Sequence, residues 1–292
     1  MPFGQSIGRQ ASDALCRQIF EMCLVVPRRK FLVPKVLTVT ISMGTRWEAY
    51  SQALLKKFVP EWRRVVVDGR RNWTPTGFIE HLIHEDVDYV VHVDEDCFVS
   101  SREGLLGLIH CLESDRSISA AGIPDGGSYY RNHNPAALNL YFVVFRASAL
   151  RFAWQERDQW PHMRFQQSYA HEVLRQRDDL DPSRISWDEG EPYYPLFWSL
   201  LSVGGRCLYL REQLHPTRWS SVVQGADGAI AEHLWYLRQW FSNDTMPGHN
   251  RSNCSRYAEF EAELLARPDS SLAFQGSVVQ GHGRRLWRRL TS

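Results

Sequence analysis

The sequence lacks the features that mark several large classes of protein. No apolar run approaches the roughly 20 residues that span a bilayer, and the first residues do not form a basic and then apolar signal peptide. Lysine and arginine total 34 against 33 acidic residues, so the chain has no net positive field to gather nucleic acid. Internal repeats and low-complexity tracts are also absent from the sequence. We therefore expect a globular, cytoplasmic protein with no nucleic-acid partner.

Cysteine is scarce and shows no metal-binding pattern. The six cysteines, at positions 16, 23, 97, 111, 207 and 254, include no C-x-x-C pair and no zinc-type grouping with histidine. We expect them to be reduced thiols, most of them buried. Apolar residues at 43% and charged residues at 23% are ordinary values for a soluble protein, so the composition does not indicate disorder.

The sequence does contain an alternation of strand-like and helix-like segments. Strands are predicted where β-branched and apolar residues cluster, at 35–43 (KVLTVTISM), 64–68 (RVVVD) and 88–93 (DYVVHV). Between them, residues 45–58 carry apolar side chains at helical spacing, and a short helix is predicted to begin at Pro75. This alternation predicts an α/β fold with a mostly parallel central sheet flanked by helices. Ligands of such sheets bind beyond the carboxyl ends of the strands.

Three acidic residues, Asp94, Glu95 and Asp96, come directly after the third predicted strand. Ser100 and Glu103 match a capping box, so we expect the acidic triplet to lie in a loop between a strand and a helix. Two carboxylates one residue apart can share a cation, and Mg²⁺ and Mn²⁺ prefer oxygen ligands and keep positions open for phosphates. The alternative is a solvated acidic turn that caps the next helix. The position beyond a strand end favours the metal site.

The order of strand, lone aspartate, helix, apolar strand and D-x-D over residues 35–113 resembles the nucleotide-binding half of GT-A glycosyltransferases, especially the family-2-like enzymes. The resemblance implies a GT-A (Rossmann-like) single domain in which Asp68, Asp94 and Thr40 contact the donor nucleotide. It also implies that Asp94 and Asp96 bind the metal. The donor would be a nucleoside-diphosphate sugar, with a UDP-sugar favoured. Asp68 is followed by GRRN and not by the further acid and serine common in the family, so the resemblance does not specify the base.

A second matching segment is WDEGE, at residues 187–191, which precedes an apolar helical segment. It resembles the family segment in which an acid at a helix start faces the acceptor and, in inverting members, removes its proton. Glu191 is the first choice for this role, with Asp188 and Glu189 as rivals. The other interpretation is that these three acids only cap the helix, because a helix N-terminus favours negative charge.

His215 follows a short strand predicted at residues 206–210. Many GT-A enzymes place a histidine at this point as the third metal ligand, so the resemblance implies a metal set of Asp94, Asp96 and His215. The alternative is a surface histidine or one held by hydrogen bonds within the protein.

The predicted domain organisation follows from the resemblance. We expect a helical leader at residues 1–34, a GT-A catalytic domain at 35–225 and a C-terminal helical extension at 226–292. Within the catalytic domain, residues 35–113 form the nucleotide-binding half and residues 114–225 the acceptor half. The extension ends in the basic cluster RRLWRRL at 284–290, which could make peripheral contact with a membrane through anionic lipid.

We expect a divalent-metal-dependent glycosyltransferase that moves a sugar from a nucleoside-diphosphate sugar to a hydroxyl of a carbohydrate or glycan acceptor. Mn²⁺ or Mg²⁺ would offset the charge on the leaving diphosphate. Two alternatives stay open, a nucleotidyltransferase that forms nucleotide-sugars and a non-catalytic carbohydrate-binding module. The first usually has a glycine-rich, basic loop after the first strand, where this chain has SMGTR. The second gives the acidic triplet no role.

Overall fold

The structure is a computed structural model that describes most of the chain between residues 34 and 235. The described residues are 34–45, 47–70, 74–215 and 219–235, together with 259, 260, 262, 263 and 266. The expected leader up to residue 33, the cysteines at 16, 23 and 254, and the basic cluster at 284–290 lie outside the described residues. Within the described part, no helix is long and apolar enough to cross a membrane.

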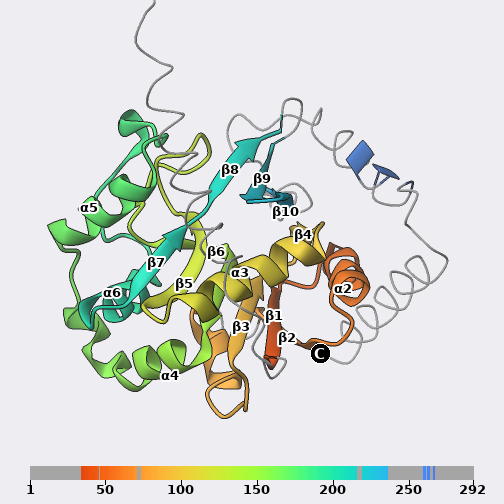
Figure 1. The fold of residues 1–292 in the computed structure, drawn as a ribbon, viewed down its shortest axis with the longest axis horizontal. Coiled ribbons are helices and arrows are strands. Elements are labelled where there is room, and N and C mark those ends of the chain that lie inside the picture. Colours follow the sequence, from red (N-terminus) through yellow and green to blue (C-terminus); the bar gives the residue numbers. More distant parts are fainter. Residues whose placement is uncertain are drawn as a thin grey trace, which may run out of the picture.

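A six-stranded sheet forms the centre of the molecule, with the strand order β2-β1-β3-β6-β5-β7 (Figure 1). Its strands are β1 (Val36–Ser42), β2 (Arg63–Asp68), β3 (Tyr89–Val93), β5 (Ile118–Pro124), β6 (Leu138–Arg146) and β7 (Arg206–Tyr209). Three of the five pairings are parallel, and β6 runs antiparallel to both of its neighbours. The strands β1, β3 and β5 are buried along their whole length, which their continuous apolar sequence predicts for strands covered on both faces.

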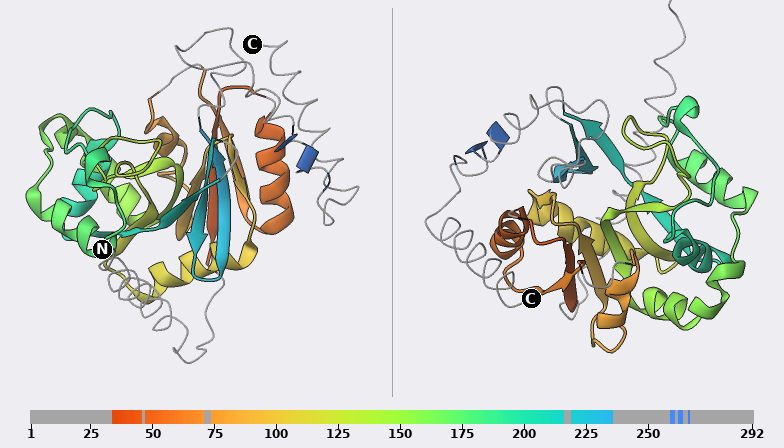
Figure 2. Two further views of the ribbon diagram at one scale, coloured as in Figure 1. Left: turned by 90° about the horizontal axis from the view of Figure 1, so that it is seen from above. Right: turned by 180° about the vertical axis from the view of Figure 1, so that it is seen from behind.

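Helices cover both faces of this sheet, which confirms the expected α/β fold with a mostly parallel central sheet (Figure 2). On one face lie α2 (Trp47–Phe58) and α3 (Arg102–Ser114). The other face is covered by α4 (Ala147–Gln155), α5 (Gln167–Gln176), α6 (Tyr194–Ser202) and the 3-10 helix η1 (Gly77–His81). Two further 3-10 helices, η2 (Arg157–His162) and η3 (Pro182–Arg184), lie in the connections between α4 and α6.

A second, four-stranded antiparallel sheet has the order β4-β10-β9-β8. Its strands are β4 (Cys97–Val99), β8 (Arg211–Leu214), β9 (Ser220–Gly225) and β10 (Gly228–Leu234). The pairing of β4 with β10 places His233 opposite Cys97, and the amide of Leu234 donates to the carbonyl of Asp96 at 3.0 Å. This long-range pairing therefore brings the end of β10 to the acidic triplet.

Two local features differ from the sequence-based expectations. β4 intervenes between the acidic triplet and the next helix, and the residue that caps α3 is Ser101, whose Oγ accepts from the amide of Gly104 at 2.9 Å. Ser100 instead donates its amide to the carbonyl of Ile230 and its hydroxyl to that of Ala229, so it belongs to the contact between β4 and β10. The division expected after residue 225 falls in the turn of the β9–β10 hairpin.

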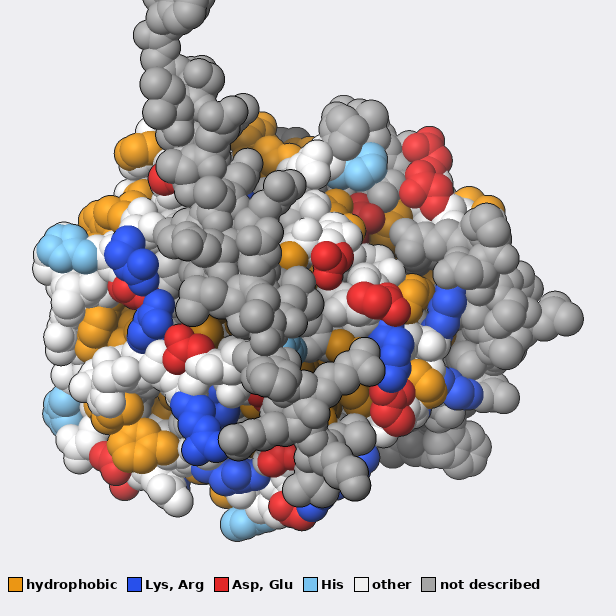
Figure 3. Space-filling view, viewed as in Figure 1, with side chains coloured by type: hydrophobic (Ala, Val, Ile, Leu, Met, Phe, Trp, Pro, Cys, Tyr) orange, Lys and Arg blue, Asp and Glu red, His pale blue; other side chains and the backbone are white. Residues whose placement is uncertain are grey.

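The described cysteines agree with the expectation of reduced, buried thiols. Cys97, Cys111 and Cys207 are all buried. On the face drawn in Figure 3, acidic and basic side chains of the described residues are interspersed and do not gather by sign, in keeping with the near balance of charge in the sequence.

Candidate active site

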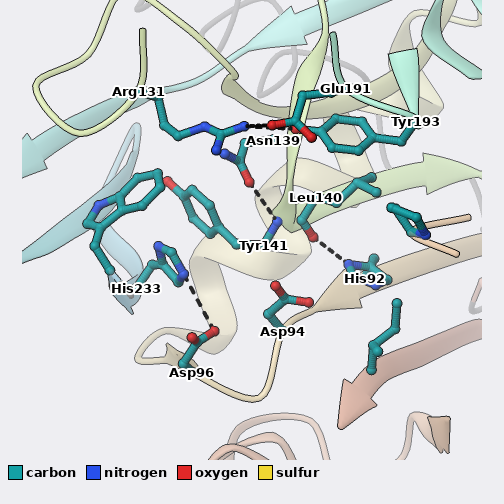
Figure 4. A pocket seen from close by; sticks show the side chains of 13 residues that line it. His92, Asp94, Asp96, Arg131, Asn139, Leu140, Tyr141, Glu191, Tyr193 and His233 are labelled. Atoms are coloured by element: carbon teal, nitrogen blue, oxygen red, sulfur yellow. Dashed lines mark hydrogen bonds and ion pairs between the residues drawn. The ribbon is translucent and has the colours of Figure 1, made fainter. Parts of the chain in front are cut away.

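A cavity of about 380 Å³ opens at the carboxyl ends of β1 and β3, where the sheet topology predicts a ligand site. Its walls come from both halves of the predicted domain and from β10 (Figure 4). The lining side chains include Asp94, Asp96 and His233 towards one end and Arg131, Glu191 and Tyr193 towards the other.

Asp96 and His233 form a close pair at one end of the cavity. The Nε2 atom of His233 lies 3.5 Å from Oδ1 of Asp96, and the two side chains are 7% and 6% exposed. The imidazole stacks on the ring of Tyr141, with ring centroids 4.0 Å apart and planes only 4° from parallel, and Trp235 meets the imidazole edge-on at 4.5 Å. The two aromatic rings therefore hold the imidazole in the orientation that brings it to Asp96.

The acidic triplet is divided between the cavity and the protein interior. Asp94 is half-buried, its amide donates to the carbonyl of Tyr141 at 2.9 Å, and its carboxylate faces the cavity (Figure 4). Glu95 points away into the interior, where its Oε2 accepts from the hydroxyl of Ser42 at 2.9 Å and from the amide of Thr45 at 3.4 Å. Asp94 and Asp96 are thus the two triplet members that can reach a ligand.

Arg131 and Glu191 form the opposite wall. Arg131 lies in the loop after β5, and its Nη2 donates to Oε1 of Glu191 at 2.7 Å. The same guanidinium makes two hydrogen bonds of 2.9 Å to the carboxylate of Asp125. Burial alone would lower the pKa of Arg131, but the charge of Asp125 and the hydrogen bonds to both carboxylates raise it. The guanidinium therefore stays charged and joins the two acids.

Asp125 is fully buried behind Arg131 and is surrounded by donors. It accepts from Nδ2 of Asn139 at 2.6 Å and from the hydroxyls of Tyr193 and Tyr194 at 2.6 and 2.8 Å. Burial raises the pKa of Asp125, while the positive charge of Arg131 and these donors oppose that rise. Burial and the charge of Asp125 also raise the pKa of Tyr193, so its hydroxyl stays protonated and donates. This network ties the loop after β5 to the start of α6.

The two residues on β1 and β2 that were predicted to contact the nucleotide, Thr40 and Asp68, do not line the cavity. Thr40 is fully buried, and its hydroxyl accepts from Nε2 of Gln52 at 2.9 Å. Asp68 ends β2 beside the carboxyl end of β1 and pairs with Arg70, whose Nε and Nη2 donate to its two oxygens at 2.9 and 2.8 Å. Asp68 therefore lies at the same edge of the sheet as the cavity but is engaged by a near neighbour.

Asp188 and Glu189, the rivals of Glu191, make contacts outside the cavity. Oδ1 of Asp188 accepts from the amide of Gly190 at 3.2 Å, and Oδ2 lies 3.7 Å from His133. Glu189 accepts from the amide of Phe165. Of the three acids in this segment, Glu191 alone lines the cavity.

His215 and His233 occupy different places in the second sheet. His215 directly follows β8, its amide donates to the carbonyl of Ser220 at 3.0 Å, and it does not line the cavity. His233 lines the cavity beside Asp96 and was missed by the reading of the sequence. The Ala226-Asp227-Gly228 turn between two β-branched segments could have predicted the β9–β10 hairpin, but no local signal predicts that β10 pairs with β4.

Arg131 and Asp125 were also not singled out from the sequence. Both lie in the segment GIPDGGSYYRNHNPAA, whose glycine, proline and asparagine content predicts only a loop. Charged residues in such a loop are usually solvated, and nothing in the local pattern distinguishes Arg131 from an exposed arginine. Its partner acids are 6 and 60 residues away in the chain.

Among the described residues, no three His, Cys, Asp or Glu side chains already lie close enough together to form a complete metal centre. Asp96 and His233 lie 3.5 Å apart at one end of the cavity, and Asp94 faces the same cavity. Carboxylates suit Mg²⁺ and Mn²⁺, whose sites often complete their coordination with water and substrate phosphates. The residues present could therefore hold a cation together with other ligands such as water.

No protein-family model and no curated protein matches this sequence. Among solved structures, the chain is similar to protein A197 from STIV, at 12% identity and a TM-score of 0.35, over 74% of this chain and 98% of that chain. It is also similar to the mannosyltransferase PcManGT from Pyrobaculum calidifontis in complex with GDP-Man and Mn²⁺, at 10% identity and a TM-score of 0.32, over 96% of each chain. Likenesses of this size do not by themselves establish a shared activity.

Proposed function

We propose that this protein is a glycosyltransferase that uses a divalent cation to transfer a sugar from a nucleoside-diphosphate sugar to a hydroxyl group of a carbohydrate acceptor. The observation that carries the proposal is that Asp94, Asp96 and His233 face Glu191 across one cavity. A donor held at the first three residues would present its sugar to an acceptor beside Glu191. The cavity volume, about 380 Å³, lies in the range of small-molecule sites.

Asp94, Asp96 and His233 would hold the cation and, through it, the diphosphate of the donor. The two aspartates offer hard oxygen ligands, and the stacking of His233 on Tyr141 keeps its imidazole directed at Asp96. When bound, the cation offsets the negative charge that develops on the leaving diphosphate. The three side chains contribute by fixing the position of the diphosphate relative to Glu191.

Glu191 would receive the proton of the acceptor hydroxyl. Its Oε1 accepts the hydrogen bond from Arg131, which leaves Oε2 for that proton. As the acceptor oxygen bonds to the anomeric carbon, the bond from that carbon to the diphosphate breaks and the proton passes to Glu191. This role belongs to an inverting reaction. In a retaining reaction Glu191 would orient the acceptor, and the anomeric configuration of the product distinguishes the two cases.

The nucleoside would lie at the edge of the sheet where β1 and β2 end, with Asp68 as the side chain that reads the base. This placement is supported by the parallel pairing of β1 and β2, which puts Asp68 beside Ser42 at the same edge as the cavity. Its ion pair with Arg70 would have to open or be shared when the base binds. The base is the part of the donor that a panel of nucleoside diphosphates identifies.

Thermal-shift measurements with UDP, GDP, CDP and ADP, each with and without Mn²⁺, test the proposal, because a ligand that binds only the folded state raises its stability. We expect at least one nucleotide to raise the Tm only when Mn²⁺ is present. Asp96→Asn should abolish that rise because an amide is a poorer ligand for a hard cation. The surface variant Asp86→Asn, which loses only an exposed pair with Lys35, is the matched control and should respond like the wild type.

Two outcomes would contradict the proposal. If no nucleotide raises the Tm in a metal-dependent way, the acidic residues do not form a donor site. If the protein binds free sugars or glycans with neither metal nor nucleotide, the carbohydrate-binding module is the better description. A response that persists in Asp96→Asn would remove Asp96 from the metal site and leave the nucleotide site to other residues.

A further inference from the structure

Arg131 is the only described residue whose side chain bonds both to the cavity acid Glu191 and to a second, fully buried acid, Asp125. Its side chain is 18% exposed, that of Asp125 is 0% exposed and that of Glu191 is 24% exposed. The guanidinium thus bridges the protein interior and the cavity. Because the fork of an arginine is planar and rigid, two hydrogen bonds to Asp125 fix the direction in which Nη2 points at Glu191.

The charges in this unit matter as much as the geometry. Arg131 forms an ion pair with Asp125 as well as with Glu191. Its positive charge is therefore shared between two carboxylates and is not given to Glu191 alone. Asp125 is held in the interior by three further donors, from Asn139, Tyr193 and Tyr194. The hydrogen bond from Arg131 therefore orients Glu191, while Asp125 shares the charge of the guanidinium.

We propose that Arg131 is a positioning residue that holds the carboxylate of Glu191 towards the donor, and that Asp125 both anchors Arg131 and balances its charge so that Glu191 remains able to accept a proton. The proposal rests on the function proposed above. It assigns to the buried Asp125 a role in the reaction that is exerted through Arg131 and not by contact with substrate.

Arg131→Lys is the first test because it keeps the positive charge and removes the fork. A lysine has one ammonium group and cannot make two hydrogen bonds to Asp125 while donating to Glu191 in the same direction. We expect kcat to fall by about 10²-fold, as for a catalytic group displaced by about 1 Å, while KM for the donor and the affinity for nucleotide with Mn²⁺ stay unchanged.

The matched control is Arg177→Lys. Arg177 is also buried and also makes two hydrogen bonds to one aspartate, Asp179, at 2.8 and 3.0 Å, but it does not line the cavity. Both variants should lower the Tm, since each loses a two-point contact with a carboxylate. Only Arg131→Lys should lower kcat. An equal loss of kcat in the two variants, or none in Arg131→Lys, would overturn the proposal.

Chemical rescue separates positioning from folding. Arg131→Ala should regain a measurable part of its lost kcat when free guanidinium is added at low, non-denaturing concentration, because the ion can occupy the space between Asp125 and Glu191. Guanidinium should not raise kcat in the wild type or in Arg177→Lys. Failure of rescue in a folded Arg131→Ala protein that still binds nucleotide with Mn²⁺ would count against the proposal.

A crystal structure of Arg131→Ala provides a measurement that does not depend on activity. We expect the Glu191 carboxylate to leave its wild-type position or to occupy several positions. A Glu191 carboxylate that stays in place without Arg131 would overturn the positioning role, whichever reaction the protein catalyses. If the wild-type protein shows no metal-dependent nucleotide binding, the proposed function is refuted instead. The two failures are therefore distinguishable.

Discussion

Replacement of His233 by alanine tests which histidine serves the cation site. Folding brings His233 to 3.5 Å from Asp96, whereas His215, the histidine implied by the family resemblance, follows β8 and does not line the cavity. His233→Ala and His215→Ala therefore form a matched pair, with the same chemical change in the same small sheet. We expect only His233→Ala to weaken the binding of nucleotide with Mn²⁺.

The size of the effect can be estimated from the number of ligands. Asp96 and His233 are the two proposed protein ligands that lie close together. Removing a residue that supports a metal site typically lowers metal affinity 10- to 100-fold, so loss of a direct ligand should lower the affinity for nucleotide with Mn²⁺ by at least that factor. A ligand at 100 times its Kd stabilises the folded state by about 2.7 kcal/mol, which raises the Tm of a domain of this size by roughly 5–11 °C. If the Kd rises 100-fold, the same ligand concentration contributes about 0.4 kcal/mol, or roughly 1–2 °C.

The assay is the ligand-induced rise in Tm, measured for each protein against its own unliganded state. This reference is needed because His233 is buried and stacked on Tyr141, so His233→Ala should also lower the Tm of the free protein. Wild type and His215→Ala should show the same rise, and His233→Ala a small fraction of it. A full rise in His233→Ala together with a reduced rise in His215→Ala would refute the assignment and return His215 to the metal set.

Four further predictions concern the acids around the cavity and the strand edge. Glu191→Gln should lower kcat by roughly 10²-fold or more with unchanged affinity for nucleotide plus Mn²⁺, as measured by initial rates and calorimetry. Asp188→Asn and Glu189→Gln should each cost about 1 kcal/mol of stability or less and preserve turnover; loss of turnover in one of them with an active Glu191→Gln would transfer the role to that residue. Asp125→Asn should destabilise the protein by about 3–5 kcal/mol in denaturant unfolding, because it leaves the charge of Arg131 without its buried partner, and a cost below about 1 kcal/mol would contradict the buried pairing. Asp68→Asn should change the order of nucleotide affinities in the thermal-shift panel while leaving the Mn²⁺ requirement intact, and an unchanged order would remove Asp68 from the base site.

The sequence by itself indicated the strands β1, β2 and β3 of the central sheet and the two acids, Asp94 and Asp96, that follow β3, but not β5 or the order of the strands. Segments such as KVLTVTISM and DYVVHV are continuous apolar runs between helical patterns, and this local signal determines that they become buried strands. Asp94 and Asp96 follow one of these strands directly, so their place at its carboxyl end was fixed by their position in the chain. Glu191 was singled out through the resemblance of the WDEGE segment to a family segment, and of the three acids in that segment it is the one that lines the cavity.

Only the tertiary structure decided the partners of these acids. His233 reaches Asp96 because β10 pairs with β4 across more than 130 residues of sequence, and Arg131 reaches Glu191 because a loop closes onto the start of α6. Hydrophobic periodicity reports which face of a strand or helix is buried, but it does not report which distant strand will be its neighbour. A charged loop residue such as Arg131 looks the same in sequence whether it is solvated or clamped between two carboxylates, since the difference is made by burial that only the folded chain provides.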